Sequence, residues 1–271
     1  MTAALRPLAV AGHDPLVLIV PAAGIPVGAY RPVAEALGDR VDVVGVDPPG
    51  HGGAPAADGD PWAAAADAVR AALESAGRDR RVAVVAHSGG AAAVLEAAEG
   101  APLDVVGCFL FEPAARPRRE DAENPMVERT RRRRAVWADR AAAEEYFAAT
   151  RPYAAFDPRA RAAFLDTGLI ADADGALHLA CPPDVEAELY RTAPARPVWD
   201  DLSRIAQEIT VAAGADPEPG TLAALAPDLV ARLAAGRLQT VDGAGHFLPL
   251  DDPTRFADLV GTWLASKGIT R

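Results

Sequence analysis

One serine of this sequence has the surroundings of an enzymatic nucleophile. Ser88 lies in the run Val-Ala-His-Ser-Gly-Gly, between an apolar run and an alanine-rich stretch typical of a helix. A serine on a tight turn between a strand and a helix has its hydroxyl exposed on a strained backbone. Such a turn needs small residues two positions before and after it, and Ala86 and Gly90 meet that requirement. The pattern predicts nucleophilic catalysis at Ser88, with a serine-capped helix start as the alternative.

A serine hydroxyl needs a base, because its free pKa makes it a poor nucleophile. His246 is the candidate, since it lies in Gly-Ala-Gly-His-Phe, just after the last expected strand, with small residues before it. His51, in Asp-Pro-Pro-Gly-His-Gly-Gly, is interpreted as part of a structural turn. The side chain of His87 is expected to point away from the Ser88 hydroxyl, because the two residues are adjacent in the chain.

A carboxylate is then needed to hold the imidazole in the right tautomer and to stabilise its charged form. Asp216 follows the apolar run 209–213 and gives the chain order Ser, Asp, His, and Glu218 in the same loop could replace it. Glu112 ends the run 105–111, in Phe-Glu-Pro, where an unpaired buried carboxylate would be costly. The sequence places Asp216 slightly ahead of Glu112.

Two backbone amides are candidates for an oxyanion hole. Gly89 opens the helix after Ser88, and the N-terminal end of a helix favours negative charge. Ala23 lies in Pro-Ala-Ala-Gly, directly after the first buried run, where small residues let an amide face a substrate. An ordinary strand-to-helix turn is the alternative interpretation of the second loop.

The elements that must position these residues follow from five short, nearly continuous apolar runs, separated by helical stretches. Such runs are typical of parallel strands buried on both faces, and they lie at 16–20, 41–46, 82–86, 105–111 and 209–213. Further strands are expected at 237–241 and, as an edge strand, at 5–11, with helices at 61–76, 89–99 and 253–267. The predicted fold is α/β, with a mostly parallel central sheet and helices on both of its faces.

The alternation stops between residues 114 and 199, where arginine, glutamate and alanine recur in helical spacing and no buried strand is expected. We therefore predict a core formed by 1–113 and 200–271, with 114–199 inserted as a helical lid or cap. The run Arg131–Arg134 is interpreted as a solvated helix face, with a cationic rim for an acidic substrate as the alternative. Six aromatic residues either line a pocket for a partly hydrophobic substrate or form the core of the lid: Trp137, Tyr146, Phe147, Tyr153, Phe156 and Phe164.

Composition excludes several other classes of protein. Apolar residues make up 50% of the 271 residues, which excludes a disordered chain, and the net charge of −11 argues against nucleic acid as a partner. Two cysteines do not make a disulfide scaffold, and with no secretory leader and no membrane span we expect a cytoplasmic monomer or homodimer acting on a small molecule. No ligand spacing predicts a metal, and no motif predicts an organic cofactor.

Taken together, these motifs resemble the α/β-hydrolase superfamily, over roughly residues 8–112 and 200–268. The elbow around Ser88, the Asp-Pro-Pro-Gly-His-Gly turn, the Gly-Ala-Asp loop and Gly-Ala-Gly-His-Phe occur in that family's order, and the insertion lies at its usual lid position. The sequence departs from the pattern at Pro21-Ala22, where His-Gly is usual, at Ala86, and in an acid loop that is one residue short. The resemblance also implies that some members take their acid from the position of Glu112. The stretch around Arg131–Arg134 is similar to that of many uncharacterised bacterial members.

The function predicted from the residues and the resemblance is that of a serine hydrolase of the carboxylic ester class. Ser88 would form an acyl-enzyme from an ester, lactone or thioester, with no cofactor and no metal. One alternative is a C–C bond hydrolase or lyase that uses the same residues. Another is a non-catalytic ligand-binding protein on this fold.

Overall fold

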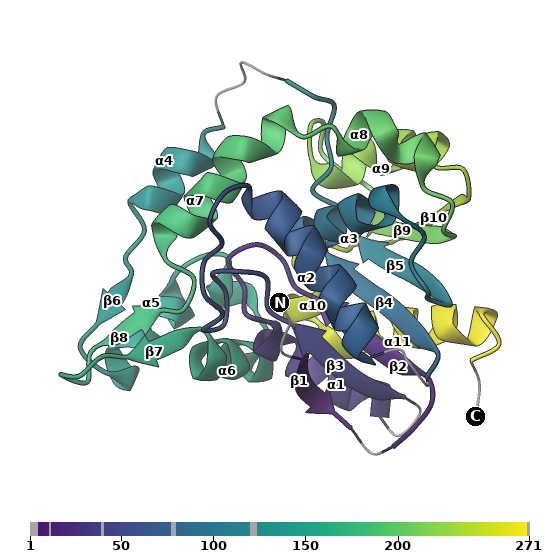
Figure 1. Cartoon of the computed structure of the whole chain (residues 1–271). Helices are drawn as coiled ribbons and strands as arrows, with labels where there is room; N and C mark the ends of the chain where they lie inside the picture. Colours follow the sequence, from purple (N-terminus) through teal and green to yellow (C-terminus); the bar gives the residue numbers. More distant parts are fainter. Residues whose placement is uncertain (1–4, 11, 39–40, 77–79, 120–123, 270–271) are drawn as a thin grey trace.

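A seven-stranded sheet forms the centre of the molecule (Figure 1). The structure is a computed structural model that describes residues 5–10, 12–38, 41–76, 80–119 and 124–269. The strand order is β1-β3-β2-β4-β5-β9-β10, in which β1 is antiparallel to β3 and every other pair is parallel. The predicted α/β class with a mostly parallel sheet is confirmed.

All of the predicted core strands are present, with small differences at their ends. They are β1 (Leu5–Ala9), β2 (Leu16–Val20), β3 (Asp42–Val46), β4 (Val82–His87), β5 (Gly107–Phe111), β9 (Ile209–Gly214) and β10 (Gly236–Val241). Strand β5 begins two residues later than expected, because Val105 and Val106 lie in a bend before it. Ala11, the expected end of the edge strand, lies outside the described residues.

Helices cover both faces of this sheet, as Figure 1 shows with α2 and α3 in front of it and α11 behind. The core helices are α1 (Arg31–Leu37), α2 (Pro61–Ala76), α3 (Ser88–Gly100), α9 (Leu222–Arg232), α10 (Leu248–Asp251) and α11 (Pro253–Ser266), with the short 3-10 helix η1 (Val27–Tyr30). Successive side chains of a strand point to opposite faces, so Val17 and Ile19 pack with α1 and α11, whereas Leu18 and Val20 pack with α2, α3 and α9. The two apolar clusters fix the sheet between its helices.

The chain between β5 and β9, called here the β5–β9 segment, lies mainly to the left of the sheet in Figure 1. Its helices are α4 (Met126–Arg131), α5 (Arg140–Ala149), η3 (Tyr153–Ala155), α6 (Pro158–Thr167), α7 (Pro183–Thr192), η4 (Ala193–Ala195), α8 (Val198–Asp201) and η5 (Leu202–Arg204). It also contains an antiparallel sheet of three short strands, β6 (Val136–Trp137), β8 (Leu177–Leu179) and β7 (Leu169–Ala171), in that order. The expectation of helices alone was incomplete, because strands of two or three residues are too short to give an apolar run.

Aromatic rings form the core of the β5–β9 segment. The ring of Phe147 packs against Trp137, Tyr153 and Phe164 at centroid distances of 4.9, 4.7 and 5.1 Å. Tyr146 packs on Trp137 at 5.3 Å. Most of the six aromatic residues that were candidates for a pocket lining therefore fill the interior of the segment.

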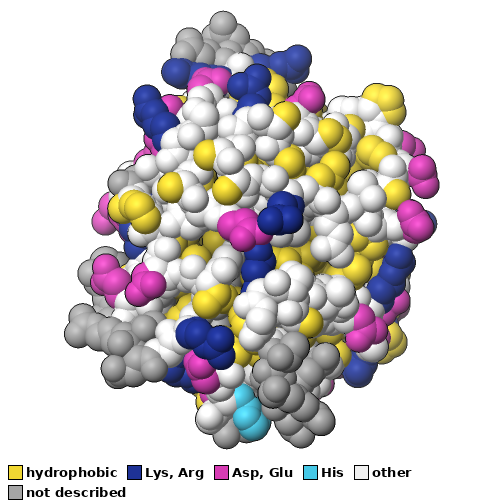
Figure 2. Space-filling view, turned by 90° about the vertical axis from the view of Figure 1, so that its right-hand side faces the viewer, with side chains coloured by type: hydrophobic (Ala, Val, Ile, Leu, Met, Phe, Trp, Pro, Cys, Tyr) yellow, Lys and Arg dark blue, Asp and Glu magenta, His cyan; other side chains and the backbone are white. Residues whose placement is uncertain are grey.

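Charges of both signs are intermixed on the surface. Figure 2 shows one face of the molecule, on which Lys and Arg side chains lie next to Asp and Glu side chains over much of the area. Glu208, for example, forms ion pairs with both Arg237 and Lys267, at 2.7 and 2.5 Å. No helix in the described ranges is long and apolar enough to cross a membrane.

Candidate active site

Ser88 lies on a strained turn between β4 and α3. Its φ is +52°, in the left-handed region that residues other than glycine rarely adopt. The turn is tight against the neighbouring strand β2. A Cβ on Gly90 would lie 2.3 Å from the carbonyl oxygen of Pro21 and 2.6 Å from that of Val20, so only glycine fits there. The geometry exposes the Ser88 side chain at the carboxyl edge of the sheet.

His246 connects Ser88 to a carboxylate. Its Nε2 lies 3.1 Å from Ser88 Oγ, and its Nδ1 lies 2.7 Å from Oε2 of Glu112. A carboxylate can only accept, so Nδ1–H donates to Glu112 and Nε2 is free to accept the hydroxyl proton of Ser88. This tautomer is the one that a general base next to a serine requires.

Glu112 is held in place from two sides. It follows β5 directly, with a φ of +43°, and it is buried, with 4% of its surface exposed. Its Oε1 accepts the backbone N–H of Gly214, at the end of β9, at 3.2 Å. A buried carboxylate needs such partners, and here the imidazole and the amide supply one for each oxygen.

The sequence placed Asp216 slightly ahead of Glu112, but the structure brings Glu112, and not Asp216, to His246. Asp216 and Glu218 are both exposed in the loop after β9, and within the described ranges no hydrogen bond joins either of them to His246. The physical reason is that Glu112, on the strand next to β4, occupies the Nδ1 side of the imidazole, so no carboxylate from the following loop is needed there.

The two candidate oxyanion donors lie side by side. A Cβ on Gly89 would lie 3.1 Å from the amide nitrogen of Ala23, so the loop after β2 approaches the start of α3 closely. Gly89 is in the first turn of α3, whose N–H groups have no partner within the helix. The two positions can therefore aim amides at one oxygen atom bound next to Ser88.

An apolar pocket opens beside these two amides. Ala23, Gly89 and Gly90 form one side of it, and α2 and α3 contribute Trp62, Ala65 and Ala93. Prolines from two loops and from the start of α2, together with His51 and Leu189, complete the lining: Pro21, Pro48, Pro49 and Pro61. The lining is mostly apolar and includes Gly89, the residue that follows Ser88.

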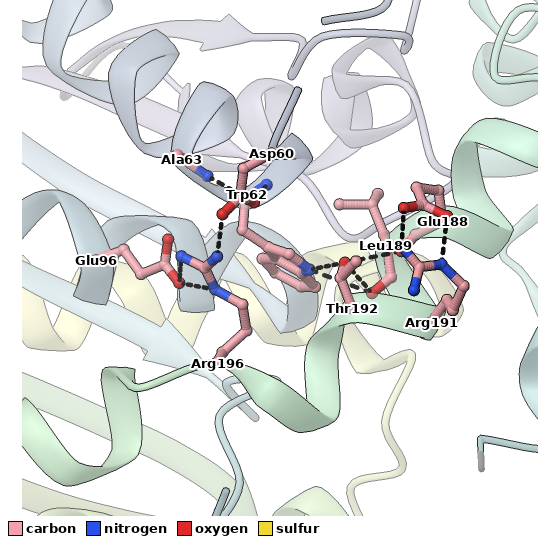
Figure 3. Close-up of polar contacts among 9 residues, drawn as sticks. All are labelled: Asp60, Trp62, Ala63, Glu96, Glu188, Leu189, Arg191, Thr192 and Arg196. Carbon is pink, nitrogen blue, oxygen red and sulfur yellow. Dashed lines mark hydrogen bonds and ion pairs between the residues drawn. The ribbon is translucent and has the colours of Figure 1, made fainter. Parts of the chain in front are cut away.

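Helix α7 of the β5–β9 segment lines one side of this pocket through Leu189 and is hydrogen-bonded to the core (Figure 3). The indole N–H of Trp62 donates to the carbonyl oxygen of Leu189 and to Oγ1 of Thr192, both at 3.1 Å. A few residues later, Arg196 lies between Glu96 of α3, at 2.5 Å, and Asp60 of the loop before α2. These contacts fix the position of Leu189 over the pocket.

The same helix touches the loop after β2 at Gly24. This loop carries Ala23 and is called here the oxyanion loop. A Cβ on Gly24 would lie 2.5 Å from the carboxylate of Glu186, which would have to move, and the φ of +75° at Gly24 favours glycine there. Glu186 is buried and pairs with Arg133 at 2.5 Å. Arg131 and Arg134 are exposed, as expected for a solvated face, but Arg133 points inward to this pair.

His51 has the structural role expected of it. Its Nε2 accepts the N–H of Gly24 at 2.8 Å, and its Nδ1 lies 3.2 Å from the carbonyl oxygen of Pro49. Burial lowers its pKa, so the ring is neutral and suited to accept that bond. It therefore braces the loop that carries Ala23.

Sequence reasoning did not identify Trp62 and Leu189 as pocket residues. The one signal for Trp62 is its place in Asp-Pro-Trp, at the start of a helix that follows a glycine-rich turn. Leu189 gives no signal, since a leucine on an amphipathic helix is usually a core residue. In the described part of the chain, no group of three or more His, Cys, Asp or Glu residues could hold a metal ion.

Comparison with known proteins agrees with this fold. The model of the family described as "Alpha/beta hydrolase family" matches residues 17–259. Among solved structures, the peroxisomal alpha-beta-hydrolase Lpx1 from Saccharomyces cerevisiae has a TM-score of 0.78 at 13% identity, covering 94% of this chain and 77% of that one. E-2-(acetamidomethylene)succinate hydrolase has a TM-score of 0.76 at 21% identity, covering 96% and 94%. The thioesterase domain from the curacin biosynthetic pathway has a TM-score of 0.73 at 18% identity, covering 95% and 94%. No curated protein matches the chain significantly.

Proposed function

Because this chain belongs to the alpha/beta hydrolase family, we propose that it is a serine hydrolase acting on esters, lactones or thioesters through an acyl-enzyme on Ser88. The observation that carries the proposal is the continuous path of hydrogen bonds from Ser88 Oγ through His246 to Glu112, at 3.1 and 2.7 Å. A buried carboxylate, an imidazole in the right tautomer and a serine on a strained turn together make an activated nucleophile.

In the first half of the reaction, Ser88 Oγ attacks the acyl carbon while His246 Nε2 takes its proton. The amides of Ala23 and Gly89 donate to the oxygen that becomes negative. One such donor lowers the activation free energy by roughly 3 kcal/mol. Glu112 stabilises the imidazolium that forms. His246 then gives the proton to the departing alcohol or thiol, which leaves Ser88 acylated.

In the second half, a water molecule loses a proton to His246 and attacks the acyl carbon. The same two amides stabilise the second tetrahedral oxyanion. Collapse breaks the bond to Ser88 Oγ, which takes back the proton from His246, and the carboxylic acid leaves. The enzyme returns to its starting state with no cofactor in the cycle.

The pocket beside Ala23 and Gly89 supports a small to medium, partly hydrophobic substrate. Its walls are apolar, so they favour an alkyl or aromatic group next to the scissile carbonyl. The similar structures carry the names of a thioesterase domain and of a hydrolase whose named substrate bears an acetamido group, so a thioester and an acetamide belong in any substrate panel beside the ester.

We also propose that residues 114–199 act as a cap over this site, on a core formed by 1–113 and 200–271. Leu189 lines the pocket and Glu186 lies against the oxyanion loop, so a bound substrate would contact both parts of the chain. The cap would then share in the choice of substrate.

The test is labelling with a fluorophosphonate probe, with peptide mass spectrometry to map the modified residue. The proposal expects one adduct at Ser88, lost in S88A and strongly slowed in H246A. S75A and H178A are matched controls, because both side chains are exposed outside the site. Rapid labelling of the S88A variant, or no labelling of the folded wild-type protein, would overturn the proposal.

A further inference from the structure

The proposed chemistry makes no use of His87, which precedes the nucleophile. It is the last residue of β4 and is 1% exposed, and its ring packs beside Tyr30 and Phe111, on the face of the sheet that α1 and α11 cover. Its Nε2 lies 2.8 Å from the backbone carbonyl oxygen of His246. The residue next to the nucleophile thus contacts the backbone of the residue that serves as its base.

The other nitrogen of His87 continues this contact to the oxyanion loop. Nδ1 lies 2.7 Å from the hydroxyl of Tyr30, and that hydroxyl accepts the N–H of Ala22 at 3.0 Å. Ala22 is the neighbour of Ala23, one of the two candidate oxyanion donors. A buried chain of three hydrogen bonds therefore runs from one side of the site to the other.

The direction of each bond in this chain is determined. The carbonyl of His246 can only accept, so His87 Nε2–H donates to it and Nδ1 is left as an acceptor. The Tyr30 O–H therefore donates to Nδ1, and its oxygen is free to accept the N–H of Ala22. Reversing any one bond would leave two donors or two acceptors facing each other.

Both side chains in the middle of the chain are uncharged. Burial lowers the pKa of His87 well below its ordinary value and raises the pKa of Tyr30. The imidazole rings of His87 and His246 are 4.9 Å apart, so a charge on His87 would oppose the proton that His246 takes up. A neutral His87 can hold His246 without that repulsion.

We propose that Tyr30 and His87 are positioning residues. They hold the oxyanion loop and the loop after β10, which carries His246, in a fixed position relative to each other across the active site. The proposal rests on the serine hydrolase function proposed above. The loops after β2 and β10 are far apart in the sequence, and this hydrogen-bonded path ties the backbone beside Ala23 to the backbone of His246 itself. Small misalignment of reacting groups costs large factors in rate.

The first test is Y30F, which removes one hydroxyl and keeps the ring. We expect the second-order rate of fluorophosphonate labelling, and kcat for a p-nitrophenyl ester, to fall roughly tenfold to a hundredfold while KM stays within about twofold. The matched control is T210V. It removes a buried hydroxyl that accepts a bond from Trp263 Nε1 at 3.1 Å, at the opposite end of β9 from Gly214, and its labelling rate should not change.

A second pair of variants tests the two ring nitrogens of His87 one at a time. A glutamine amide nitrogen can take the place of Nε2 and still donate to the His246 carbonyl, whereas asparagine can only replace Nδ1 and accept from Tyr30. Each variant therefore breaks the path at one bond, and we expect kcat and the labelling rate of both to fall by about the factor expected for Y30F, with KM within about twofold. A role in folding alone would leave kcat unchanged in the folded variants.

The proton between His246 Nδ1 and Glu112 gives a readout that needs no catalysis. Its downfield NMR resonance should shift or broaden in Y30F, H87Q and H87N, and should match wild type in T210V. Wild-type labelling rates in folded Y30F and H87N, with an unchanged resonance, would overturn the positioning role. Failure of the wild-type protein to label would instead contradict the proposed function. The resonance would still decide whether the hydrogen-bonded path through Tyr30 and His87 positions His246.

Discussion

Ser88 and Glu112 occupy equivalent places at the ends of two neighbouring parallel strands. The residues before them, His87 and Phe111, are register partners in β4 and β5, and both Ser88 and Glu112 have a positive φ, +52° and +43°. Each such position costs about 1–3 kcal/mol and persists only when the surrounding structure holds it. The two turns direct both side chains to the same edge, where one imidazole bridges them.

Replacing Glu112 by glutamine should remove most of the activity. Glutamine keeps the shape but cannot stabilise the imidazolium, and its N–H₂ can force the wrong tautomer on His246. We expect kcat/KM for a p-nitrophenyl ester to fall by about 10²–10⁴-fold. D216N is the matched control, an identical chemical change on the exposed carboxylate, and should be within about twofold of wild type. A larger loss in D216N than in E112Q would show that the acid comes from the loop after β9.

Shortening Leu189 should change the substrate preference. L189A enlarges the pocket beside Ala23 and Gly89, so esters with longer acyl chains gain relative to the acetate ester. One methylene in such a pocket is worth about 10–200-fold in selectivity, and a ratio of kcat/KM for hexanoate over acetate that rises by at least tenfold is expected. L229A also truncates a buried leucine, in α9 away from the pocket, and should leave that ratio unchanged. An unchanged ratio in L189A would mean that the acyl chain binds elsewhere.

The ion pair between Arg196 and Glu96 should matter for stability. Glu96 is buried, and burial raises its pKa despite the nearby guanidinium. R196M leaves this carboxylate without a partner and should lower the free energy of unfolding in urea by about 3–5 kcal/mol. The double variant E96L/R196M should recover much of the loss. R204M breaks an exposed pair with Asp201 and should cost less than about 1 kcal/mol. Equal losses of unfolding free energy in R196M and R204M would show that the Arg196–Glu96 pair matters no more for stability than an exposed ion pair.

Asp251 gives stability a pH dependence of unusual sign. Desolvation raises its pKa to about 6, against the opposing effect of nearby His246. The folded protein therefore holds a proton that the unfolded chain, with an ordinary aspartate, has already lost, and stability falls as pH rises from about 4 to about 6. D251N should thus have a higher Tm than wild type at pH 8 and the same Tm at pH 4. Because the side chain is only partly withdrawn from solvent, the gain is small.

D258N provides the comparison for this titration, since Asp258 is an exposed aspartate of α11. Its Tm should follow that of wild type at both pH values. A lower Tm for D251N at pH 8 would show that ionised Asp251 stabilises the fold.

The core could be predicted because its strands are buried on both faces. Runs such as Leu16–Val20 and Ile209–Gly214 are apolar throughout, and the helix Pro61–Ala76 has the expected bounds. Ser88, His246 and Ala23 each follow a predicted strand of this sheet, and for that reason the sequence could place them at one edge. These are local patterns, and they suffice when each element has a strong pattern of its own.

The choice of acid could not be made from local pattern. Asp216 and Glu112 both follow buried strands, and what separates them is the direction of one side chain. That direction depends on the positive φ of Glu112 and on the N–H of Gly214, which lies 102 residues away in the chain. The aromatic residues around Phe147 show a related limit, because helical spacing gives no indication of whether a ring faces a pocket or its own core.

The contact of Arg196 with Glu96 bears on how enzymes of this architecture diversify. Glu96 lies on the helix that begins at the nucleophile, and its partner comes from the stretch that leads back to the core. A recombinant in which only the proposed cap, residues 114–199, was exchanged for one without this arginine would carry a buried carboxylate with no cation. Inheritance of a new cap therefore requires the donor to supply an arginine at this junction, or the recipient to lose its glutamate in the same step.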